Sequence, residues 1–420
     1  MKTVGIIAEY NPLHQGHLRQ ISFIREKRNA DYIVAVMSGD FVQRGTPALL
    51  SKHARAECAL RSGVDLVLEL PVSVSSASAE FFAKGGVEIL DGIGVIDELC
   101  FGSEEGLLPL FHKTSEILCE EPAEYQILLK QGLKNGLSFP AARSQALADY
   151  VSLTGEKISA ENYKLFLAEP NNILGIEYCK ALRSLHSPIR PVTLKREGAG
   201  YHEQELSQAQ TPSASGIRAY LKAGGYSPEC SASGPDAFLT DFLPDASVEM
   251  LKKSQAANQF VFENDLDSLL GYRLFLETHD TLCQYLDVSA ELASRILRMR
   301  NQYTGFLQFA ALLKTKELTQ TRIQRALLHI LLNIREIPSS IGYARVLGFR
   351  KSAAPLLSAI KKEGTIPLIT KAADASRILD NKTFQTFQTN TVSSNIYESL
   401  LISKTHQPII HEYEKTLVIL

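Results

Sequence analysis

Short apolar runs alternate with amphipathic stretches over the first hundred residues of the chain. The runs predict β-strands at Thr3 to Ala8, Tyr32 to Met37, Asp65 to Leu70 and Glu98 to Phe101. The stretches between them predict helices at Gly16 to Arg25, from a cap at Ser51 to Arg61, and at about Ala77 to Leu90. Short continuous strands that alternate with helices are typical of a parallel sheet covered on both faces. The expected fold class is therefore α/β with a doubly wound parallel sheet.

The pattern changes twice further along the chain. From about 115 to 165 it becomes polar and helical, which predicts a helical insertion, and it then returns to a strand at Pro191 to Arg196 and a helix that opens at Ser213 or Ser215. A stretch rich in Gly, Ser and Pro at 223–237 marks the edge of this core. We therefore expect a core domain at 1–225 and a mainly helical domain at 226–420, helical up to about 362, with mixed β-branched and polar runs in the tail.

Composition narrows the class of protein. With 45% hydrophobic and 21% charged residues, the 420-residue chain is typical of a soluble globular protein, and its start, MKTVGIIAEYNP, matches neither a signal peptide nor a membrane span. A cytoplasmic location is expected. The chain has 44 Lys and Arg against 46 Asp and Glu, so the protein as a whole has no positive potential that would attract a polyanion. A nucleic-acid site must therefore be a local patch. The six cysteines lack CxxC spacing, which favours buried or idle thiols over zinc or redox sites.

The loop after the first strand, AEYNPLHQGH at 8–17, lies where parallel sheets bind ligands. Gly16 lets a ligand approach the backbone, and the helix that follows offers free N–H groups to an anion. His14 and His17, three residues apart, can both donate hydrogen bonds to a phosphate. A chance HxxH pattern is the alternative, and spacing alone does not decide between them. Zinc would need further ligands for which no spacing is visible, and no Walker phosphate loop follows any strand.

Two motifs resemble a known superfamily. HQGH at 14–17 resembles the HxGH signature of the nucleotidyltransferases, and SASGIR at 213–218 resembles their second signature. The resemblance implies a HUP-like core in which Ser213, Ser215 and Arg218 contact the β- and γ-phosphates of a nucleotide. It also implies that an acceptor oxygen attacks the α-phosphate directly, while histidines and arginine stabilise the departing pyrophosphate. No protein nucleophile is needed in such a reaction.

Further stretches resemble one family, the bacterial tRNA-methionine cytidine acetate ligases: GIIAEYNPLHQGH at 5–17, MSGDFVQRGTPAL at 37–49, FGSE at 101–104, PNNILGIEY at 170–178 and LKTKELTQTRIQR at 313–325. The resemblance implies that ATP activates acetate as acetyl-adenylate. The acetyl group then passes to the wobble cytidine of elongator tRNA(Met), which gives N4-acetylcytidine and AMP. ATP as a substrate with Mg²⁺, acetate and this tRNA are the implied cofactors and partners.

The resemblance assigns site residues by position. His14 and His17 would be catalytic, and the ATP-binding set would comprise Ile7, Ala8, Glu9, Tyr10, Asn11, Pro12, Leu13, His14, Gln15, Gly16, His17, Leu18, Arg19, Gln20, Gly102, Asn171 and Arg196. The neighbouring Asn172 leaves the Asn171 assignment open by one position, and a helix cap for Asn171 and a solvated strand end for Arg196 are the alternatives. Arg44 is a candidate to hold a phosphate or acetate and Asp40 to place Mg²⁺, with surface salt bridges as the alternative.

A local basic patch lies in the C-terminal half. Residues 295–350 contain ten Lys or Arg and two acids, a net charge of +8, which is typical of a phosphate-backbone partner. The candidate tRNA-binding residues are Arg295, Arg298, Lys314, Lys316, Arg322 and Arg325. The helical spacing of Phe306, Phe309, Leu312 and Leu313 favours core packing over base stacking. Two other functions are possible alternatives. A metabolite adenylyltransferase would have the two motifs but no use for the basic patch. A catalytically inactive RNA-binding protein would use the patch but would not need His14, Gly16, His17 and Arg218.

Overall fold

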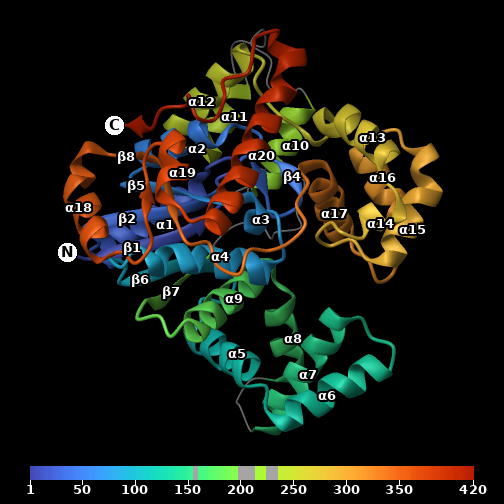
Figure 1. Ribbon diagram of the computed structural model, residues 1–420. Helices are drawn as coiled ribbons and strands as arrows, with labels where there is room; N and C mark the ends of the chain where they lie inside the picture. The colour runs from blue at the N-terminus through green and yellow to red at the C-terminus, as the bar shows by residue number, and fades with distance from the viewer. Residues whose placement is uncertain (155–158, 197–212, 224–234) are drawn as a thin grey trace.

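The computed structural model describes residues 1–154, 159–196, 213–223 and 235–420. At its centre five parallel strands lie in the order β5-β2-β1-β6-β7 (Figure 1). Their bounds are Thr3–Ala8 for β1, Tyr32–Ser38 for β2, Leu66–Leu70 for β5, Glu98–Ser103 for β6 and Arg190–Lys195 for β7. The strand order reverses at β1, so that a crevice opens at the carboxyl ends of β1 and β6, the usual ligand position in such sheets.

Helices cover both faces of the sheet. Helices α1 (Gln15–Lys27) and α2 (Lys52–Arg61) bury Ile21 and Leu60 against one face, together with Val4. The opposite face is covered by α4 (Ala79–Gly92) and α9 (Pro170–Ser184), with the short α3 (Val72–Ser75) beside them. Alternate residues of each strand point to opposite faces. The predicted doubly wound α/β class is confirmed, and each predicted strand and helix of the first hundred residues is present within three residues of its expected ends.

The predicted helical insertion lies between β6 and β7 and forms a separate lobe at the bottom of Figure 1. It comprises α5 (Leu108–Glu120), α6 (Ala123–Lys134), α7 (Phe139–Leu153) and α8 (Ala160–Ala168). The rings of Phe111 and Phe166 meet edge to face, 5.0 Å apart, and Phe101 of β6 packs on Phe111 at 5.3 Å. These ring contacts pack the lobe against the end of β6.

Most helices after β7 form two groups. Near the sheet lie α10 (Ala214–Lys222), α11 (Pro235–Phe242) and α12 (Asp245–Ala256). The second lobe, at the right of Figure 1, contains α13 (Asp267–Leu276), α14 (His279–Leu282), α15 (Ala290–Met299), α16 (Phe306–Leu313) and α17 (Gln320–Leu332). Phe306, Phe309 and Leu313 are fully buried in its core, which confirms the core interpretation of their spacing. The linker predicted at 223–237 lies largely outside the described residues.

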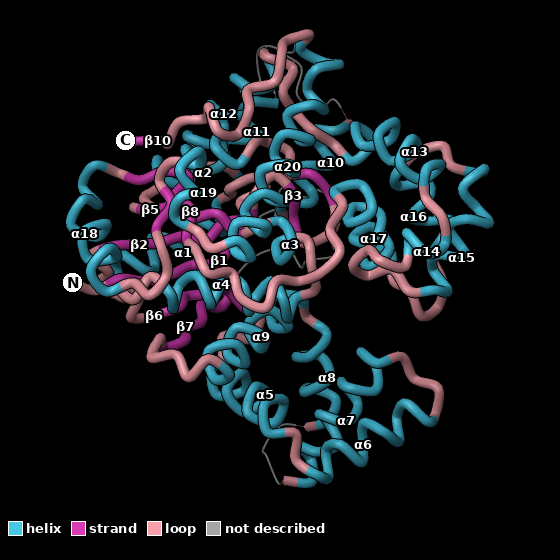
Figure 2. Tube along the Cα trace, viewed as in Figure 1, coloured by secondary structure: helices cyan, strands magenta, loops and turns pink. Residues whose placement is uncertain are grey.

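The predicted domain boundary differs from the structure. Strands β8 (Ala344–Phe349) and β10 (Val418–Ile419) belong to the core sheet, β8 pairing antiparallel with β5, and β9 (Leu368–Ile369) pairs with β8 (Figure 2). Helices α18 (Ala354–Glu363), α19 (Ala375–Ile378) and α20 (Asn381–Thr405) pack around this extension. Residues from 344 onward therefore complete the core instead of a separate helical domain. The short segment ARVLGF at 344–349 has no period that separates a buried strand from a helix, which explains the wrong prediction of helix there.

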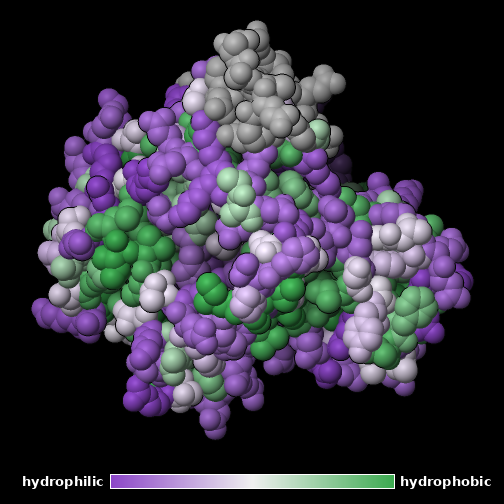
Figure 3. All heavy atoms as spheres, turned by 90° about the horizontal axis from the view of Figure 1, so that it is seen from above, coloured by the Kyte–Doolittle hydropathy of each residue, from purple (hydrophilic) through white to green (hydrophobic). Residues whose placement is uncertain are grey.

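The face drawn in Figure 3 is largely hydrophilic, with a contiguous hydrophobic patch at its left and a hydrophobic band near its centre. Within the described ranges, no helix combines the length and the apolar character that a membrane crossing needs. Five cysteines have free thiols, with Cys58, Cys100 and Cys179 buried, Cys119 half-buried and Cys283 exposed, while Cys230 lies outside the described residues.

Candidate active site

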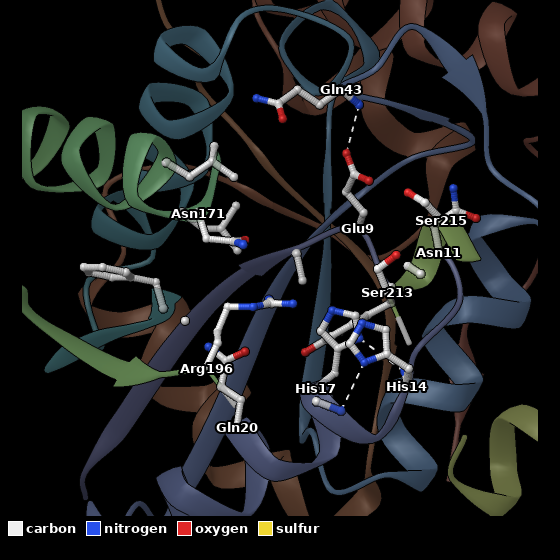
Figure 4. A pocket seen from close by; sticks show the side chains of 18 of the residues that line it. Glu9, Asn11, His14, His17, Gln20, Gln43, Asn171, Arg196, Ser213 and Ser215 are labelled. Atoms are coloured by element: carbon white, nitrogen blue, oxygen red, sulfur yellow. Dashed lines mark hydrogen bonds between the residues drawn. The ribbon is translucent and has the colours of Figure 1, made fainter. Parts of the chain in front are cut away.

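A cavity of about 420 Å³ opens at the carboxyl ends of β1, β6 and β7 (Figure 4). Its wall combines the loop after β1, the end of β6, the start of α9, the end of β7 and the start of α10. Most of the predicted nucleotide residues line it: Ile7, Ala8, Glu9, Tyr10, Asn11, His14, Gly16, His17, Arg19, Gln20, Gly102, Asn171, Arg196, Ser213, Ser215 and Arg218. The structure thus brings together segments that are up to two hundred residues apart in the sequence.

His14 and His17 form a stacked pair at the start of α1, with ring centroids 3.9 Å apart. The backbone N–H of Gly16 donates to Nδ1 of His14 at 3.0 Å, and the N–H of His14 donates to Nδ1 of His17 at 3.2 Å. Since both Nδ1 atoms accept hydrogen bonds, the proton of each neutral ring lies on Nε2. Each Nε2–H is then a donor that the backbone has already oriented. A side chain at Gly16 would meet the His14 ring at 2.9 Å, so this turn requires glycine.

Both imidazoles are held neutral. Burial lowers the pKa of His14 to about 3, and the Arg196 guanidinium adds to the effect. Burial also lowers the pKa of His17 well below its ordinary value, with smaller contributions from His14 and Arg196. Arg196 extends toward the two rings in Figure 4. A site of neutral donors beside a guanidinium suits an anion whose charge increases during a reaction.

A second helix begins at the same cavity. The Ser213 hydroxyl accepts a hydrogen bond from the Gly216 N–H at 3.2 Å and so caps α10. Arg218, one turn further, donates from Nη1 to the Asn11 carbonyl at 2.7 Å and from Nη2 to Ser215 at 3.4 Å. Arg218 therefore links the second signature to the first loop. Two helix N-termini, at α1 and α10, present N–H groups to one cavity, which is an arrangement that binds phosphates.

The end of β6 gives the cavity a flat wall. A Cβ atom at Gly102 would lie 3.3 Å from the Cγ atom of Arg196, whose backbone N–H donates to the Ser103 carbonyl at 2.8 Å. Arg196 lies at an exposed strand end, as the alternative interpretation expected, and its side chain nevertheless lines the cavity. A planar group can lie along Gly102 without meeting a side chain at that position.

The two neighbouring asparagines have different roles. Asn171 lines the cavity, and its Nδ2 donates to Glu104 Oε1 at 2.6 Å. Asn172 is fully buried; its Oδ1 accepts from the Glu104 N–H at 3.1 Å and its Nδ2 donates to the Phe166 carbonyl at 3.1 Å. Of the two positions that the sequence left open, only Asn171 can reach a ligand, while Asn172 fixes the turn after β6.

This difference gives a testable contrast. We expect Asn171→Ala to leave the fold intact and to raise the KM for the ligand of the cavity, because the lost group faces that ligand. Asn172→Ala is expected to lower the free energy of unfolding by about 1–3 kcal/mol, because the Glu104 N–H and the Phe166 carbonyl lose their partner. Thermal melting of both variants, with steady-state kinetics of the first, measures the contrast. Equal melting temperatures for the two variants would contradict it.

Some predicted site residues do not line the cavity. Asp40 is buried and does not line the cavity: its Oδ1 accepts from the Lys52 N–H at 2.8 Å, and its Oδ2 lies 3.8 Å from the Lys52 ammonium. The proposed role in placing Mg²⁺ is therefore wrong, since the carboxylate faces a buried lysine that the sequence pattern did not reveal. Arg44 does line the cavity. Within the predicted loop, Pro12, Leu13, Gln15 and Leu18 are absent from the lining, and Leu13 belongs instead to the hydrophobic core with Val4 and Ile21.

The structure adds residues that the sequence analysis did not single out. Glu104, Tyr178 and Lys195 line the cavity. Arg55 of α2 is buried, and its guanidinium donates to the carbonyls of Glu9 at 2.7 Å and Ser38 at 3.0 Å, and also to that of Gly39. It thus ties the loops after β1 and β2 together. Periodicity gives no signal for a helical arginine that points into the core.

The basic patch is only partly available to a ligand. Arg298, Lys314, Lys316 and Arg322 are exposed. Arg295 donates to the carbonyls of Leu312 and Leu313 at 3.0 and 2.9 Å, and Arg325 lies 3.3 Å from Asp287. Arg345 is buried among carboxylates in the core sheet, so it does not belong to a surface patch. The exposed positive side chains, which a ligand can reach, lie on α15, on α17 and on the turn between α16 and α17.

Comparison with known proteins gives consistent matches along the whole chain. Residues 1–411 match the family described as HIGH nucleotidyl transferase. The chain is 36% identical over 428 residues to the tRNA(Met) cytidine acetate ligase of Acetivibrio thermocellus, with 100% of both chains covered. The enzyme of the same name from Clostridium tetani is 40% identical over 378 residues, which cover 88% of this chain and 90% of the relative.

Solved structures agree with these matches. The apo crystal structure, form I, of Thermotoga maritima TmcAL superposes with a TM-score of 0.92 at 31% identity and covers 100% of both chains. Form II of the same protein, bound with alpha-thio ATP, superposes with a TM-score of 0.90 at the same identity and coverage.

Proposed function

This chain belongs to the HIGH nucleotidyl transferase family and, within it, to the tRNA(Met) cytidine acetate ligases, and from this premise we propose that it uses ATP and acetate to acetylate the wobble cytidine of elongator tRNA(Met). One observation carries the chemical part of the proposal. Two neutral, backbone-oriented imidazoles and two helix N-termini converge on one cavity, beside Arg196 and Arg218. Such a cavity stabilises a leaving pyrophosphate without a protein nucleophile.

In the first step an acetate oxygen attacks the α-phosphorus of ATP. An oxygen–phosphorus bond forms to give acetyl-adenylate, and the bond between the α-phosphorus and the bridging oxygen breaks, so that pyrophosphate leaves with the electron pair. The Nε2–H groups of His14 and His17 donate to the phosphates as their charge grows, and Arg218 lies at the N-terminus of the second helix. The residues hold the reactants in line and change no protonation state of their own.

The nucleotide would lie along the β-strand ends. Its phosphates would occupy the N-termini of α1 and α10, and its base would lie along Gly102 toward Asn171. The acetyl-adenylate is a mixed anhydride and must be kept from water until the acceptor arrives. The starts of α9 and α10, which both line the cavity, are placed to limit that access.

The described side chains that line the cavity do not form a complete set of protein ligands for Mg²⁺. Within the ranges that the structure describes, no three His, Cys, Asp or Glu side chains converge on a metal-sized gap, and Asp40 is buried away from the cavity. Magnesium that accompanies ATP would be held mainly by the phosphates, as is common for this ion. The chemistry it would supply is neutralisation of phosphate charge.

The acceptor tRNA would bind at the lobe of α13–α17. The exposed positive side chains there neutralise phosphates, and α17 packs against the hairpin that carries Gln43 and Arg44 into the cavity. A tRNA substrate also fits the expected cytoplasmic location.

The test of this function is a labelling experiment. Purified protein is incubated with ATP, radiolabelled acetate and either elongator tRNA(Met) or its transcript with the wobble cytidine changed to uridine. Label on the first RNA only, with one AMP per acetyl group, is the expected result. Pyrophosphate release that requires a small-molecule acceptor would support a metabolite adenylyltransferase, and RNA binding without ATP turnover would support an inactive RNA-binding protein.

The basic lobe gives a second prediction. We expect the triple variant Lys314→Ala, Lys316→Ala, Arg322→Ala to weaken tRNA binding at all sequences and to reduce the slope of log K against log salt by roughly 1 per lost phosphate contact. Acetate-dependent ATP–pyrophosphate exchange should be preserved. The triple variant Lys351→Ala, Lys361→Ala, Lys362→Ala also removes three exposed charges, from another part of the surface, and is the matched control. An equal loss in the control would show that only net charge matters.

A further inference from the structure

Glu9 places a negatively charged carboxylate in the cavity that we propose binds two anions, ATP and acetate. It follows directly after β1, lines the cavity and accepts a hydrogen bond at Oε1 from the Gln43 N–H at 2.9 Å. Figure 4 shows this carboxylate turned toward Gln43 and away from His14 and His17. Its second oxygen accepts no hydrogen bond from any residue in the described ranges. Within the described part of the chain, one carboxylate oxygen is therefore held in place and the other is available to a ligand.

A negative charge here opposes the first reaction step. Both ATP and acetate are anions, and a carboxylate beside their meeting point raises the energy of that encounter. The other carboxylate in the cavity differs, because Glu104 accepts from Asn171 Nδ2 at 2.6 Å and from the Asn172 N–H at 3.1 Å, so both of its oxygens have a partner. A carboxylate oxygen without a partner suits a ligand that donates N–H groups. In the proposed reaction the acceptor base, with its exocyclic amine, is such a donor.

The position of Glu9 also fits the second substrate. Its partner Gln43 belongs to the hairpin of β3 (Phe41–Val42) and β4 (Thr46–Pro47), which packs against α17 of the basic lobe. At Gly45 of this hairpin an added Cβ atom would lie 2.5 Å from the backbone nitrogen of Arg325, so the hairpin lies directly on that helix. The hairpin thus connects the wall that contains Glu9 to the basic lobe.

We propose that Glu9 is a catalytic residue of the acyl-transfer step, in which its carboxylate binds the exocyclic amine of the acceptor cytosine and takes its proton; this inference rests on the function proposed above. The amine nitrogen attacks the carbonyl carbon of acetyl-adenylate, and a carbon–nitrogen bond forms. The bond between that carbon and the phosphate oxygen breaks, and AMP leaves with the electron pair. The N–H proton passes to Glu9 and then to water. The backbone N–H of Gln43 orients the carboxylate for this transfer, and Arg55 holds the Glu9 carbonyl behind it.

The experiment separates the two half-reactions in the full-length protein. The first is followed by acetate-dependent ATP–pyrophosphate exchange, and the second by single-turnover transfer from chemically prepared acetyl-adenylate to elongator tRNA(Met), corrected for the uncatalysed rate. Glu9→Gln keeps the size of the side chain and an oxygen that can accept from the Gln43 N–H. We expect the ratio of the transfer rate to the exchange rate to fall by roughly 100-fold or more in this variant.

Glu104→Gln is the matched control, since it removes the other carboxylate of the same cavity. Any loss in this variant should be shared by both half-reactions, because Glu104 acts on Asn171 and the nucleotide. A Glu9→Gln variant whose two rates fall together, or stay together, would overturn the inference and assign Glu9 to nucleotide binding or to structure alone. A wild-type protein that lacks either half-reaction would instead overturn the proposed function, so the two failures are distinguishable.

Discussion

Replacing His17 by alanine is expected to slow acetyl-adenylate formation by about 100- to 1000-fold, the usual effect of removing one oriented donor to a developing charge. The Nδ1 atom of His17 accepts from the His14 N–H at 3.2 Å, which turns Nε2–H outward, and the ring stacks on His14. The loss should fall on kcat more than on the KM for ATP, because the donor is most useful when pyrophosphate leaves. Acetate-dependent ATP–pyrophosphate exchange measures it.

The pH dependence checks the protonation state behind this prediction. Burial lowers the pKa of His14 to about 3 and that of His17 well below its ordinary value, so neither ring should add a limb to the pH–rate profile near pH 6.5. The unfolded chain takes up a proton at His14 below pH 6.5 that the folded chain takes up only near pH 3. The contribution of His14 to the free energy of unfolding therefore decreases as the pH falls through this range. A limb near 6.5 that disappears in His14→Asn would contradict neutral imidazoles.

Replacing Lys52 by methionine is expected to destabilise the fold by about 3–5 kcal/mol, the usual cost of leaving buried charges without their partner. Lys52 is fully buried on α2. Its ammonium lies 2.5 Å from Glu69 of β5 and 2.6 Å from Glu412, and it donates to the Ser394 hydroxyl of α20 at 2.7 Å. Arg345 of β8 contacts the same two glutamates. The network thus joins the core sheet to the C-terminal segment.

Two further variants make the Lys52 prediction specific. Combining Lys52→Met with Glu412→Leu should restore part of the lost stability, because Arg345 then has one buried glutamate to neutralise, Glu69, instead of two. A double-mutant cycle measures the coupling. Arg61→Met on the same helix breaks a solvent-exposed ion pair with Glu249 and should change the melting temperature far less. Chemical denaturation gives the free energies. Similar losses for Lys52→Met and Arg61→Met would show that the buried network does not stabilise the fold.

The local part of the site could be predicted from the sequence because its geometry is set within a few residues. The Nδ1 contacts of His14 and His17 span two and three residues, and Ser213 caps a helix within three. These are backbone-driven arrangements that recur wherever the same residues start a helix. The sequence could not show which of Asn171 and Asn172 faces the cavity, because this depends on how α9 packs over the turn that contains Glu104.

The parts that were predicted wrongly depend on long-range contacts. Asp40 looked like a ligand-facing carboxylate at a strand end, and a lysine on the following helix turned it inward. Arg345 looked like part of a basic surface, and Glu69 and Glu412 bury it in the sheet. In both cases the sequence shows that the residue is charged, but a partner on another helix or strand determines where its side chain points.

The sequence by itself determined the α/β alternation, the helical insertion, the loop with its two histidines and the second phosphate motif, since periodicity, capping and loop chemistry act over one or two turns of chain. The tertiary structure alone decided that residues 344–349 and 418–419 complete the first sheet, that the Gln43 N–H holds the Glu9 carboxylate, and that Lys52 donates to Ser394, 342 residues away. Such contacts follow from the burial of complementary surfaces, and no local pattern records which distant segment supplies the partner.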